Sequence, residues 1–247
     1  MSKFILNTEK IFSKSKPIDK LKSLDAIQIM INEQIEGVKT LLNTISDLDV
    51  ITQKIYEKLS FDLSSRLIYV GAGTSGRIGV QDGAELYPTF GWPKSRVEFC
   101  IAGGKKALIN SIENAEDDVN NAKSNFKKLL VSDKDIVLGI SASGRTPFTN
   151  KFLELSKANN ALCIAISNNE NAEIFKFSHF KIFLDTKEEV IAGSTRLKAG
   201  TSQKACLNII TSIVMIKLGR VKMGMMNFLV PSNQKLRERK KRIDIEI

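Results

Sequence analysis

Five short apolar segments, each followed by glycine or a polar residue, dominate the middle of the chain. They occupy residues 67–71, 97–101, 136–140, 161–166 and 180–184. Runs of this length and composition are typical of buried parallel strands. The intervening segments, such as 107–130 and 149–159, are long enough for crossover helices. This alternation predicts an α/β fold: a doubly wound, mostly parallel five-stranded sheet with helices on both faces.

Apolar residues follow a helical spacing on either side of this region. From residue 23 to about 60 the spacing predicts two amphipathic helices with a break near 47–49, and a last long helix is expected over 194–218. The predicted organisation is an N-terminal helical region over 1–56, a sheet domain over 57–220 and a basic C-terminal tail over 221–247.

Composition bears on whether the protein enters a membrane, is secreted or contains disulfides. No apolar run reaches membrane-spanning length, and the first residues lack the apolar stretch and cleavage site of a signal peptide. Three widely spaced cysteines, Cys100, Cys163 and Cys206, form no metal-ligand pattern and cannot all pair. We therefore expect a cytoplasmic protein in a reducing environment, with no membrane partner and no metal.

The formal net charge of +10 raises the question of nucleic-acid binding. Residues 235–242 hold six basic side chains and one acidic side chain, so half of the excess lies in one tail segment. The rest is scattered, without the interleaved aromatic residues that a single-strand binding surface needs. We interpret the tail as a solvated helix face, or as a segment that helps to recruit an anionic substrate, and expect no nucleic-acid partner.

Two loops that follow predicted strands are rich in glycine and hydroxyl side chains. In open parallel sheets, ligands bind at the carboxyl ends of the strands, where loops meet helix N-termini. Glycine lets the backbone approach an anion, and hydroxyls and helix N-terminal N–H groups donate to its oxygens. The candidate phosphate-binding residues are Gly73, Thr74, Ser75, Gly76 and Arg77 after the first strand, and Ser141, Ser143, Gly144, Arg145 and Thr146 after the third.

Gly71, Gly73 and Gly76 also have the spacing of a dinucleotide-binding fingerprint. That motif needs an acid at the end of the second strand. The second strand ends at Ile101 and is followed by Ala-Gly-Gly, with no acid. The crowding of Ser and Thr in both loops favours a phosphomonoester over a pyrophosphate. We therefore expect no nicotinamide and no other cofactor.

Residues 141–147, Ser-Ala-Ser-Gly-Arg-Thr-Pro, resemble the phosphate-binding loop of sugar-isomerase (SIS) domains. A wider set of stretches is similar to the N-acetylmuramic acid 6-phosphate etherases, with the glucokinase regulatory proteins as more distant relatives. The matching stretches are 70–77, 101–104, 113–118 and 193–201. The similarity runs from about Thr8 to Arg242, and it implies that residues 57–220 form an SIS phosphosugar-binding domain.

This resemblance implies a lyase reaction, the cleavage of the D-lactyl ether of N-acetylmuramic acid 6-phosphate to N-acetylglucosamine 6-phosphate and D-lactate. A carboxylate removes the C2 proton beside the aldehyde of the opened sugar, and a second carboxyl protonates the departing ether oxygen. Water then adds to the unsaturated aldehyde. The resemblance makes Glu85 the proton donor and Glu116 the base. Spacing alone favours solvent-facing charge for Glu116 and its acidic neighbours, and Glu113 is the alternative base.

A third loop precedes the last long helix and adds two hydroxyls and two cations. Its candidates for contact with phosphate or a sugar oxygen are Ser194, Arg196 and Lys198. Equally, the two cations could hold carboxylates in place, for instance Glu188 or Glu189. The single histidine, His179, is expected to be a packing or surface residue rather than a catalyst.

The chain departs from the family pattern at three places. Ala84 stands where the family usually carries a serine, just before the predicted acid. The family's N-terminal pattern survives only as Thr8-Glu9-Lys10. Family members continue into a further small helical module, and we expect that module to be absent because the chain stops at Ile247.

Two other functions stay open at this point. One is a non-catalytic SIS sensor that binds a phosphosugar and regulates a partner. The other is an aldose–ketose phosphosugar isomerase, which also removes a proton beside a carbonyl but needs no leaving-group acid. SIS domains commonly dimerise, so the resemblance implies a homodimer, with the N-terminal amphipathic helices as a plausible surface for it.

Overall fold

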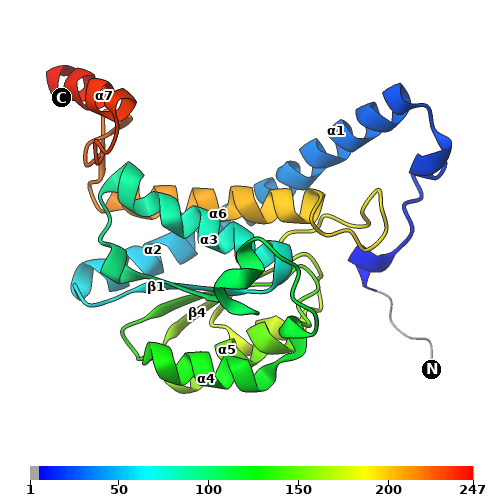
Figure 1. Ribbon diagram of the computed structural model, residues 1–247, viewed down its shortest axis with the longest axis horizontal. Helices are drawn as coiled ribbons and strands as arrows, with labels where there is room; N and C mark the ends of the chain where they lie inside the picture. The colour runs from blue at the N-terminus through cyan, green and yellow to red at the C-terminus, as the bar shows by residue number, and fades with distance from the viewer. Residues whose placement is uncertain (1–5, 247) are drawn as a thin grey trace.

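Five parallel strands form the centre of the fold, in the order β2-β1-β3-β4-β5 (Figure 1). The computed structural model describes residues 6–246. The strands are β1 Leu67–Gly71, β2 Val97–Ile101, β3 Ile136–Ile140, β4 Leu162–Ser167 and β5 Phe180–Phe183. The five strands predicted from the apolar segments are confirmed, with ends shifted by at most one residue in β4 and β5. A short hairpin of β6 (Val221–Lys222) and β7 (Met225–Met226) was not predicted.

Helices precede, connect and follow the strands. In the described part of the chain the α-helices are α1 Ser23–Lys39, α2 Ile45–Phe61, α3 Gly73–Phe90, α4 Val119–Leu129, α5 Pro147–Ala158, α6 Lys198–Lys217 and α7 Gln234–Glu246. The 3-10 turns are η1 Asn7–Glu9, η2 Ile18–Lys20, η3 Thr40–Thr44, η4 Lys94–Arg96, η5 Gly104–Leu108, η6 Ala115–Asp117 and η7 Glu173–Phe177.

Alternate residues of each strand face opposite layers of helices. Because both faces of the strands are buried, their sequences are continuous apolar runs. Leu67 and Tyr69 of β1 belong to a core with α2, α3 and α6, whereas Ile68 and Val70 belong to a core with α4 and α5. The prediction of a doubly wound sheet with helices on both faces is confirmed.

The strand order reverses between β1 and β3. From β1 the chain moves to β2 on one side, and it then returns to β3 on the other side of β1. Gly71 at the end of β1 lies opposite Ile140 at the end of β3. Reversal of this kind opens a crevice at the carboxyl ends of the two central strands. The two glycine-rich and hydroxyl-rich loops therefore leave neighbouring strands at one crevice.

The N-terminal helices differ from the prediction in where they break and in what they cover. The break is the turn η3, earlier than the predicted 47–49, because Thr40 and Thr44 bond back to the carbonyls of Gly37 and Leu41 and α2 begins at Ile45. Helix α2 packs in the same core as the sheet. The predicted boundary at 56–57 falls inside α2, so this helix belongs structurally to the sheet domain.

Helix α1 extends from the body of the molecule beside α6 and leaves one of its faces uncovered (Figure 1). Large apolar side chains line this face and continue over η3, the start of α2 and the outer side of α6. They are Leu24, Ile27, Ile31, Ile35, Val38, Leu42, Ile45, Ile209, Ile213 and Ile216, each more than a third exposed. We call this set the apolar face.

The C-terminal part departs from the sequence prediction only in detail. Helix α6 begins at Lys198 rather than at 194. The Glu189 carboxylate accepts the backbone N–H groups of Lys198 and Ala199, and it thereby caps the N-terminus of the helix at this position. Within the predicted basic tail, Gln234–Glu246 form α7, at the end of the chain (Figure 1). Among the helices that the structure describes, none is both long and apolar enough to cross a bilayer.

One buried ion pair fastens α1 to the start of α6. The ammonium of Lys198, which is 1% exposed, bonds to the carboxylate of Glu33 on α1, and Lys14 binds the other oxygen at 2.8 Å. Burial alone would raise the pKa of Glu33, but the hydrogen bonds from Lys14 and Lys198 outweigh it and hold that pKa below its usual value. Gly37 adds to this contact, because a Cβ there would lie 2.9 Å from Cβ of Lys198.

Glu33→Gln is expected to destabilise the protein by about 3–5 kcal/mol, because it leaves the Lys198 ammonium buried without a counter-charge. The matched control is Glu36→Gln, which breaks an exposed pair with Lys39 on the same helix and should change stability by less than about 0.5 kcal/mol. Urea unfolding monitored by circular dichroism measures both.

The same substitution should change how stability depends on pH. Because the pKa of Glu33 is lower in the folded than in the unfolded chain, its contribution is complete above about pH 4.5 and is lost as the pH falls through the folded pKa. The free energy of unfolding of Glu33→Gln should therefore fall less steeply below that pH than that of the unmodified protein. An equal slope would contradict the role assigned to this carboxylate.

Candidate active site

The first glycine-rich loop turns directly from β1 into α3. Gly73 and Thr74 open the helix, so N–H groups without intrahelical partners lie at its N-terminus. Gly76 permits the close approach of the helix to the strand, because a Cβ there would lie 2.8 Å from the carbonyl oxygen of Gly71. The helix N-terminus is suited to an anion. Thr74 is half-buried and its hydroxyl bonds to no other described residue, so it is available to a ligand.

Ser75 and Arg77 of the same loop are already engaged within the protein. The buried Ser75 hydroxyl donates to Oε1 of Gln203 at 2.9 Å. The Arg77 guanidinium donates to the carbonyls of Ala107 and Asn110 at 2.9 and 2.8 Å. Ser75 and Arg77 were predicted to bind the ligand. Their hydrogen bonds instead attach the first loop to α6 and to the segment from Ala107 to Asn110.

The second loop is a tight hydroxyl-bonded turn between β3 and α5. Oγ of Ser141 accepts the N–H of Gly144 at 3.0 Å and lies 2.9 Å from the Thr146 hydroxyl, and Oγ of Ser143 accepts the N–H of Arg145 at 3.1 Å. Gly144 has φ of +67°, and a Cβ there would lie 2.3 Å from Cβ of Ala172, so only glycine fits. The turn ends where Pro147 starts α5, which brings a second helix N-terminus to the crevice.

A buried chain of amide hydrogen bonds connects the two loops. From Ser75 it runs to Gln203, whose Nε2 donates to Oδ1 of Asn168 at 2.8 Å. The backbone N–H of Asn168 donates to the carbonyl of Ala142 in the second loop at 3.1 Å, and Nδ2 of Asn169 donates to the same carbonyl at 2.9 Å. The separation of the loops is thus fixed through α6 and the end of β4.

Sequence reasoning missed Gln203, which lies mid-helix with no motif around it. It gave no role to Asn168 and Asn169, which follow β4. Fully buried amides are costly unless every donor and acceptor is satisfied. Their positions beside loop residues could therefore be recognised only once the contacts were visible.

A cleft of about 320 Å³ adjoins the first loop. Gly73 and Arg77 line one side of it, and the segment from η5 to η6 lines the other, including Glu113 and Glu116. Asp118, the last acid of this run, instead caps α4 by accepting the N–H of Asn121 at 2.8 Å. The structure thus brings the predicted base, Glu116, and its alternative, Glu113, to the first loop.

Glu85 lies elsewhere in the same chain. It is exposed on α3, twelve positions after Gly73, and it is not among the residues that line this cleft. A straight helix rises about 1.5 Å per residue, so Glu85 lies roughly 18 Å along the axis from the start of α3. The buried acid of this helix, Asp82, is structural: it accepts hydrogen bonds from Tyr69, Asn208 and Thr211, and burial raises its pKa.

The third predicted loop separates into buried and exposed parts. Lys198 is buried against Glu33, so this cation holds a carboxylate as one interpretation proposed, although the partner is neither Glu188 nor Glu189. Ser194 is half-buried, while Arg196 is exposed and forms no ion pair with the described residues.

His179 lies away from the cleft and accepts a hydrogen bond from the backbone N–H of Cys163 on its Nδ1 atom, at 3.1 Å. The three cysteines are buried free thiols, and burial raises the pKa of Cys100 and of Cys163 to about 12. Within residues 6–246, no group of three or more His, Cys, Asp or Glu is arranged to hold a metal ion.

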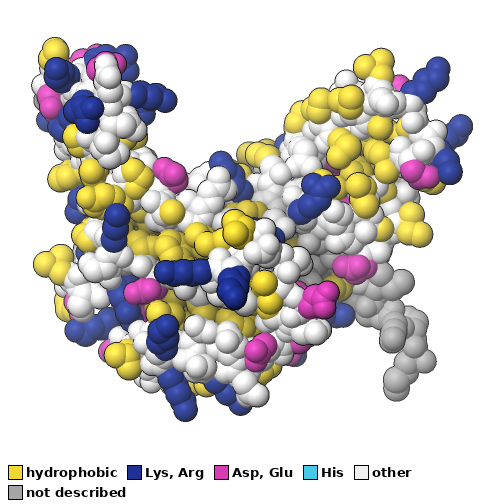
Figure 2. All heavy atoms as spheres, in the orientation of Figure 1, with side chains coloured by type: hydrophobic (Ala, Val, Ile, Leu, Met, Phe, Trp, Pro, Cys, Tyr) yellow, Lys and Arg dark blue, Asp and Glu magenta, His cyan; other side chains and the backbone are white. Residues whose placement is uncertain are grey.

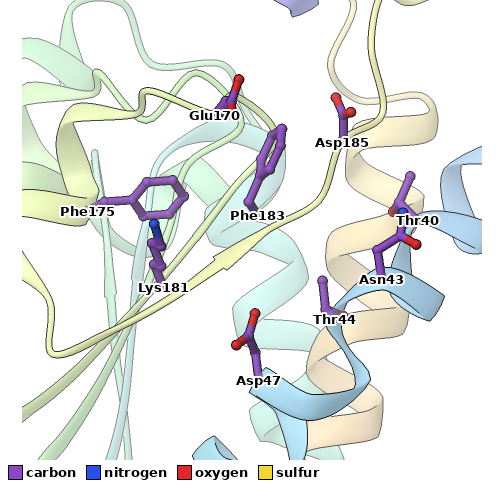
Figure 3. Close-up of a pocket in the computed structure, with 9 residues that line it drawn as sticks. All are labelled: Thr40, Asn43, Thr44, Asp47, Glu170, Phe175, Lys181, Phe183 and Asp185. Carbon is purple, nitrogen blue, oxygen red and sulfur yellow. The ribbon is translucent and has the colours of Figure 1, made fainter.

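A second polar cavity, of about 350 Å³, lies between η3 with the start of α2 and the ends of β4 and β5 (Figure 3). Asp47, Glu170 and Asp185 line it together with one cation, Lys181. None of the predicted phosphate ligands borders it. Three carboxylates against one ammonium make this cavity unfavourable for a phosphate.

Known proteins resemble this chain in sequence and in fold. Residues 49–157 match the family described as glucokinase regulatory protein N-terminal SIS domain. An N-acetylmuramic acid 6-phosphate etherase of Clostridium acetobutylicum is 41% identical over 242 residues, covering 96% of this chain and 78% of that protein. The Bacillus mycoides protein of the same name is 40% identical over 241 residues, covering 98% and 81%.

Among solved structures, a putative phosphosugar isomerase of Bacteroides fragilis superimposes with a TM-score of 0.63 at 17% identity, covering 82% of this chain and 95% of that one. A phosphoheptose isomerase of Francisella tularensis gives a TM-score of 0.56 at 16% identity, covering 80% and 98%. At these identities the two structures establish the shared fold alone. The sequence identity over nearly the whole chain goes further, and it shows that this protein belongs to the N-acetylmuramic acid 6-phosphate etherase family.

Proposed function

We propose that this protein is a lyase that cleaves the D-lactyl ether of N-acetylmuramic acid 6-phosphate to give N-acetylglucosamine 6-phosphate and D-lactate. The observation that carries the proposal is that the two hydroxyl-rich loops leave adjacent strands at the reversal of the sheet, and that Glu116 lines a cleft beside the first of these loops. Relatives about 40% identical over nearly the full chain bear the name of this activity.

The phosphate of the sugar is held between the starts of α3 and α5. Thr74 and the first N–H groups of α3 donate from one side, and the Ser143 hydroxyl and the start of α5 donate from the other. Arg145 and Arg196 are exposed cations that add charge around the entrance. Lys198 supports the site indirectly, by fixing α1 against the first turn of α6.

Two carboxyl groups perform the elimination. Glu116 removes the C2 proton of the open-chain sugar, and the electrons form the C2–C3 double bond as the C3–oxygen bond breaks. Glu85 protonates the departing oxygen, which leaves as D-lactate. Water then adds to C3 and a proton returns to C2, so that N-acetylglucosamine 6-phosphate is released. Each positioned acid or base contributes about 10²–10⁴ in rate.

An isomerase is the second candidate, and one observation favours it. The cleft of a single chain holds the proposed base, Glu116, without Glu85, and a base alone suffices to move a proton beside a carbonyl. The Bacteroides fragilis neighbour is itself described as a putative phosphosugar isomerase. Release of D-lactate separates the two candidates, because an aldose–ketose isomerase releases none.

The apolar face indicates how the protein assembles. Ten large hydrophobic side chains remain uncovered on α1, η3, α2 and α6 in one chain. A second copy can cover them by an isologous contact, in which the same surface pairs with itself. The proposed unit is therefore a homodimer. Buried, unpaired thiols accord with a cytoplasmic location.

Glu116→Gln should lower the rate of D-lactate release by a factor of about 10²–10⁴, because the C2 proton loses its acceptor. Coupling to D-lactate dehydrogenase measures the rate. Asp117→Asn is the matched control, since this exposed neighbour does not line the cleft, and its rate should stay within about twofold. Unmodified protein that releases no D-lactate would contradict the proposed function.

Gly144→Ala should weaken binding of N-acetylglucosamine 6-phosphate at least about tenfold, because the added Cβ meets Ala172 and displaces the second loop. Gly219→Ala is the control: its φ is also positive, but a Cβ there meets no atom within 4 Å. Both variants carry backbone strain of about 1 kcal/mol, so only the displaced loop distinguishes them. Isothermal titration calorimetry reports the affinity, and equal affinities in the two variants would count against this loop as a ligand site.

The double substitution Ile31→Glu with Ile35→Glu should convert the dimer into monomers, because both side chains are about half exposed on the apolar face and charge is costly inside an interface. Leu63→Glu, at an 82%-exposed position outside the apolar face, should leave the dimer intact. Sedimentation velocity distinguishes the two states, and a monomeric unmodified protein would refute the assembly.

A further inference from the structure

The proposed substrate carries a second anion besides its phosphate, the carboxylate of the D-lactyl group. This group is attached through oxygen to C3, next to the carbon from which Glu116 is proposed to take a proton. The carboxylate therefore enters the cleft that Glu113 and Glu116 line. Both glutamates repel it, so a nearby cation is needed to bind this part of the substrate.

Arg77 is the one positively charged residue among the described residues that line this cleft. It is half-buried on α3, four positions after Gly73, which corresponds to about 6 Å along the helix axis. Only a few covalent bonds separate the C6 phosphate of a hexose from the substituent on C3. A sugar whose phosphate lies at the start of α3 can therefore bring its lactyl group to Arg77.

The guanidinium of Arg77 is held in place but is not saturated. Nε donates to the carbonyl of Ala107 at 2.9 Å, and Nη2 donates to the carbonyl of Asn110 at 2.8 Å. A guanidinium has about five N–H groups, and the others bond to no residue within 6–246. Because both partners are neutral carbonyls and no ion pair links Arg77 to the described carboxylates, the protein does not neutralise its charge. A planar fork of N–H donors matches the two oxygens of a carboxylate.

We propose that Arg77 determines the specificity of the cleft by binding the lactyl carboxylate through its remaining N–H groups. The contact offsets the repulsion from the two glutamates and orients the bond between C3 and the ether oxygen beside Glu116. Phosphosugars without a second anion gain nothing from it. This inference rests on the proposed lyase function, and it names the group by which the cleft recognises its substrate.

A neutral analogue of the substrate isolates this contact. In the analogue, a carboxamide of nearly the same shape replaces the lactyl carboxylate, and formation of N-acetylglucosamine 6-phosphate measures kcat/KM for both compounds. The unmodified protein should prefer the acid at least about tenfold. Arg77→Gln should reduce this preference by a factor of about 10–100, because a hydrogen-bonded charge pair is lost while both glutamates remain.

The preference, rather than the rate, is the informative readout, because Arg77 also holds the segment that leads to Glu116. If Arg77 acted only through that segment, or if it bound the phosphate, Arg77→Gln would slow both compounds by the same factor and leave the preference unchanged. That outcome would overturn the inference. Arg77→Lys keeps the charge without the planar fork, and it should retain an intermediate preference.

Cations outside the cleft provide the control. Figure 2 shows Lys and Arg side chains at many places on the visible face, and with its positive net charge the surface as a whole attracts anions. Lys105→Gln removes an exposed cation of η5 that does not line the cleft, and it should change the preference by less than about twofold. A loss of preference in Lys105→Gln, Arg145→Gln or Arg196→Gln as large as that in Arg77→Gln would contradict the role of Arg77.

Binding measurements separate failure of this inference from failure of the proposed function. In a Glu116→Gln background, which slows turnover, Arg77→Gln should lower the affinity for the acid at least about tenfold more than that for the carboxamide. Isothermal titration calorimetry measures both affinities. Active unmodified protein with an unchanged preference in Arg77→Gln refutes only the role of Arg77. Unmodified protein that releases no D-lactate refutes the proposed function, and equal losses of affinity in the titration, or no binding of either compound, would then overturn the inference as well.

Discussion

The reversal of strand order between β1 and β3 is the constraint on which the rest of the structure depends. Because β1 and β3 are neighbours and their chains leave toward opposite sides, the loops after Gly71 and Ile140 open onto one crevice. Helices α3 and α5 begin there, so the N-termini of both helices lie at the ends of adjacent central strands, and such N-termini favour anions. The buried amides of Gln203 and Asn168 then fix the spacing of the loops.

The carboxylates of the cleft, Glu113 and Glu116, come from the segment between η5 and α4, outside the sheet. Glu116 lies on the turn η6, which Arg77 helps to position by binding the preceding segment. In one chain the cleft therefore has the carboxylates of Glu113 and Glu116 beside the start of α3, and the proposed function takes Glu116 as its base. The proposed etherase reaction also needs a leaving-group acid, and the proposed one, Glu85, is exposed on α3 and does not line that cleft.

Local patterns in the sequence predicted the five strands and the positions of the two glycine-rich loops after β1 and β3, because strand burial and glycine-rich turns are encoded by neighbouring residues. Features that depend on distant contacts were not predictable. Lys198 forms an ion pair with Glu33, which lies on a helix distant in the sequence. Gln203 connects the two loops only through its hydrogen bonds with Ser75 and Asn168. The break at η3 was displaced for a local reason, since threonine hydroxyls can bond back to the helix carbonyls.

A crystal structure with N-acetylglucosamine 6-phosphate bound tests the central claim most directly. The account predicts that the phosphate lies between Thr74 and Ser143, at the starts of α3 and α5, with C2 of the sugar facing the carboxylate of Glu116. A phosphate bound elsewhere, for example in the cavity beside Lys181, or a sugar whose C2 points away from Glu116, would contradict it.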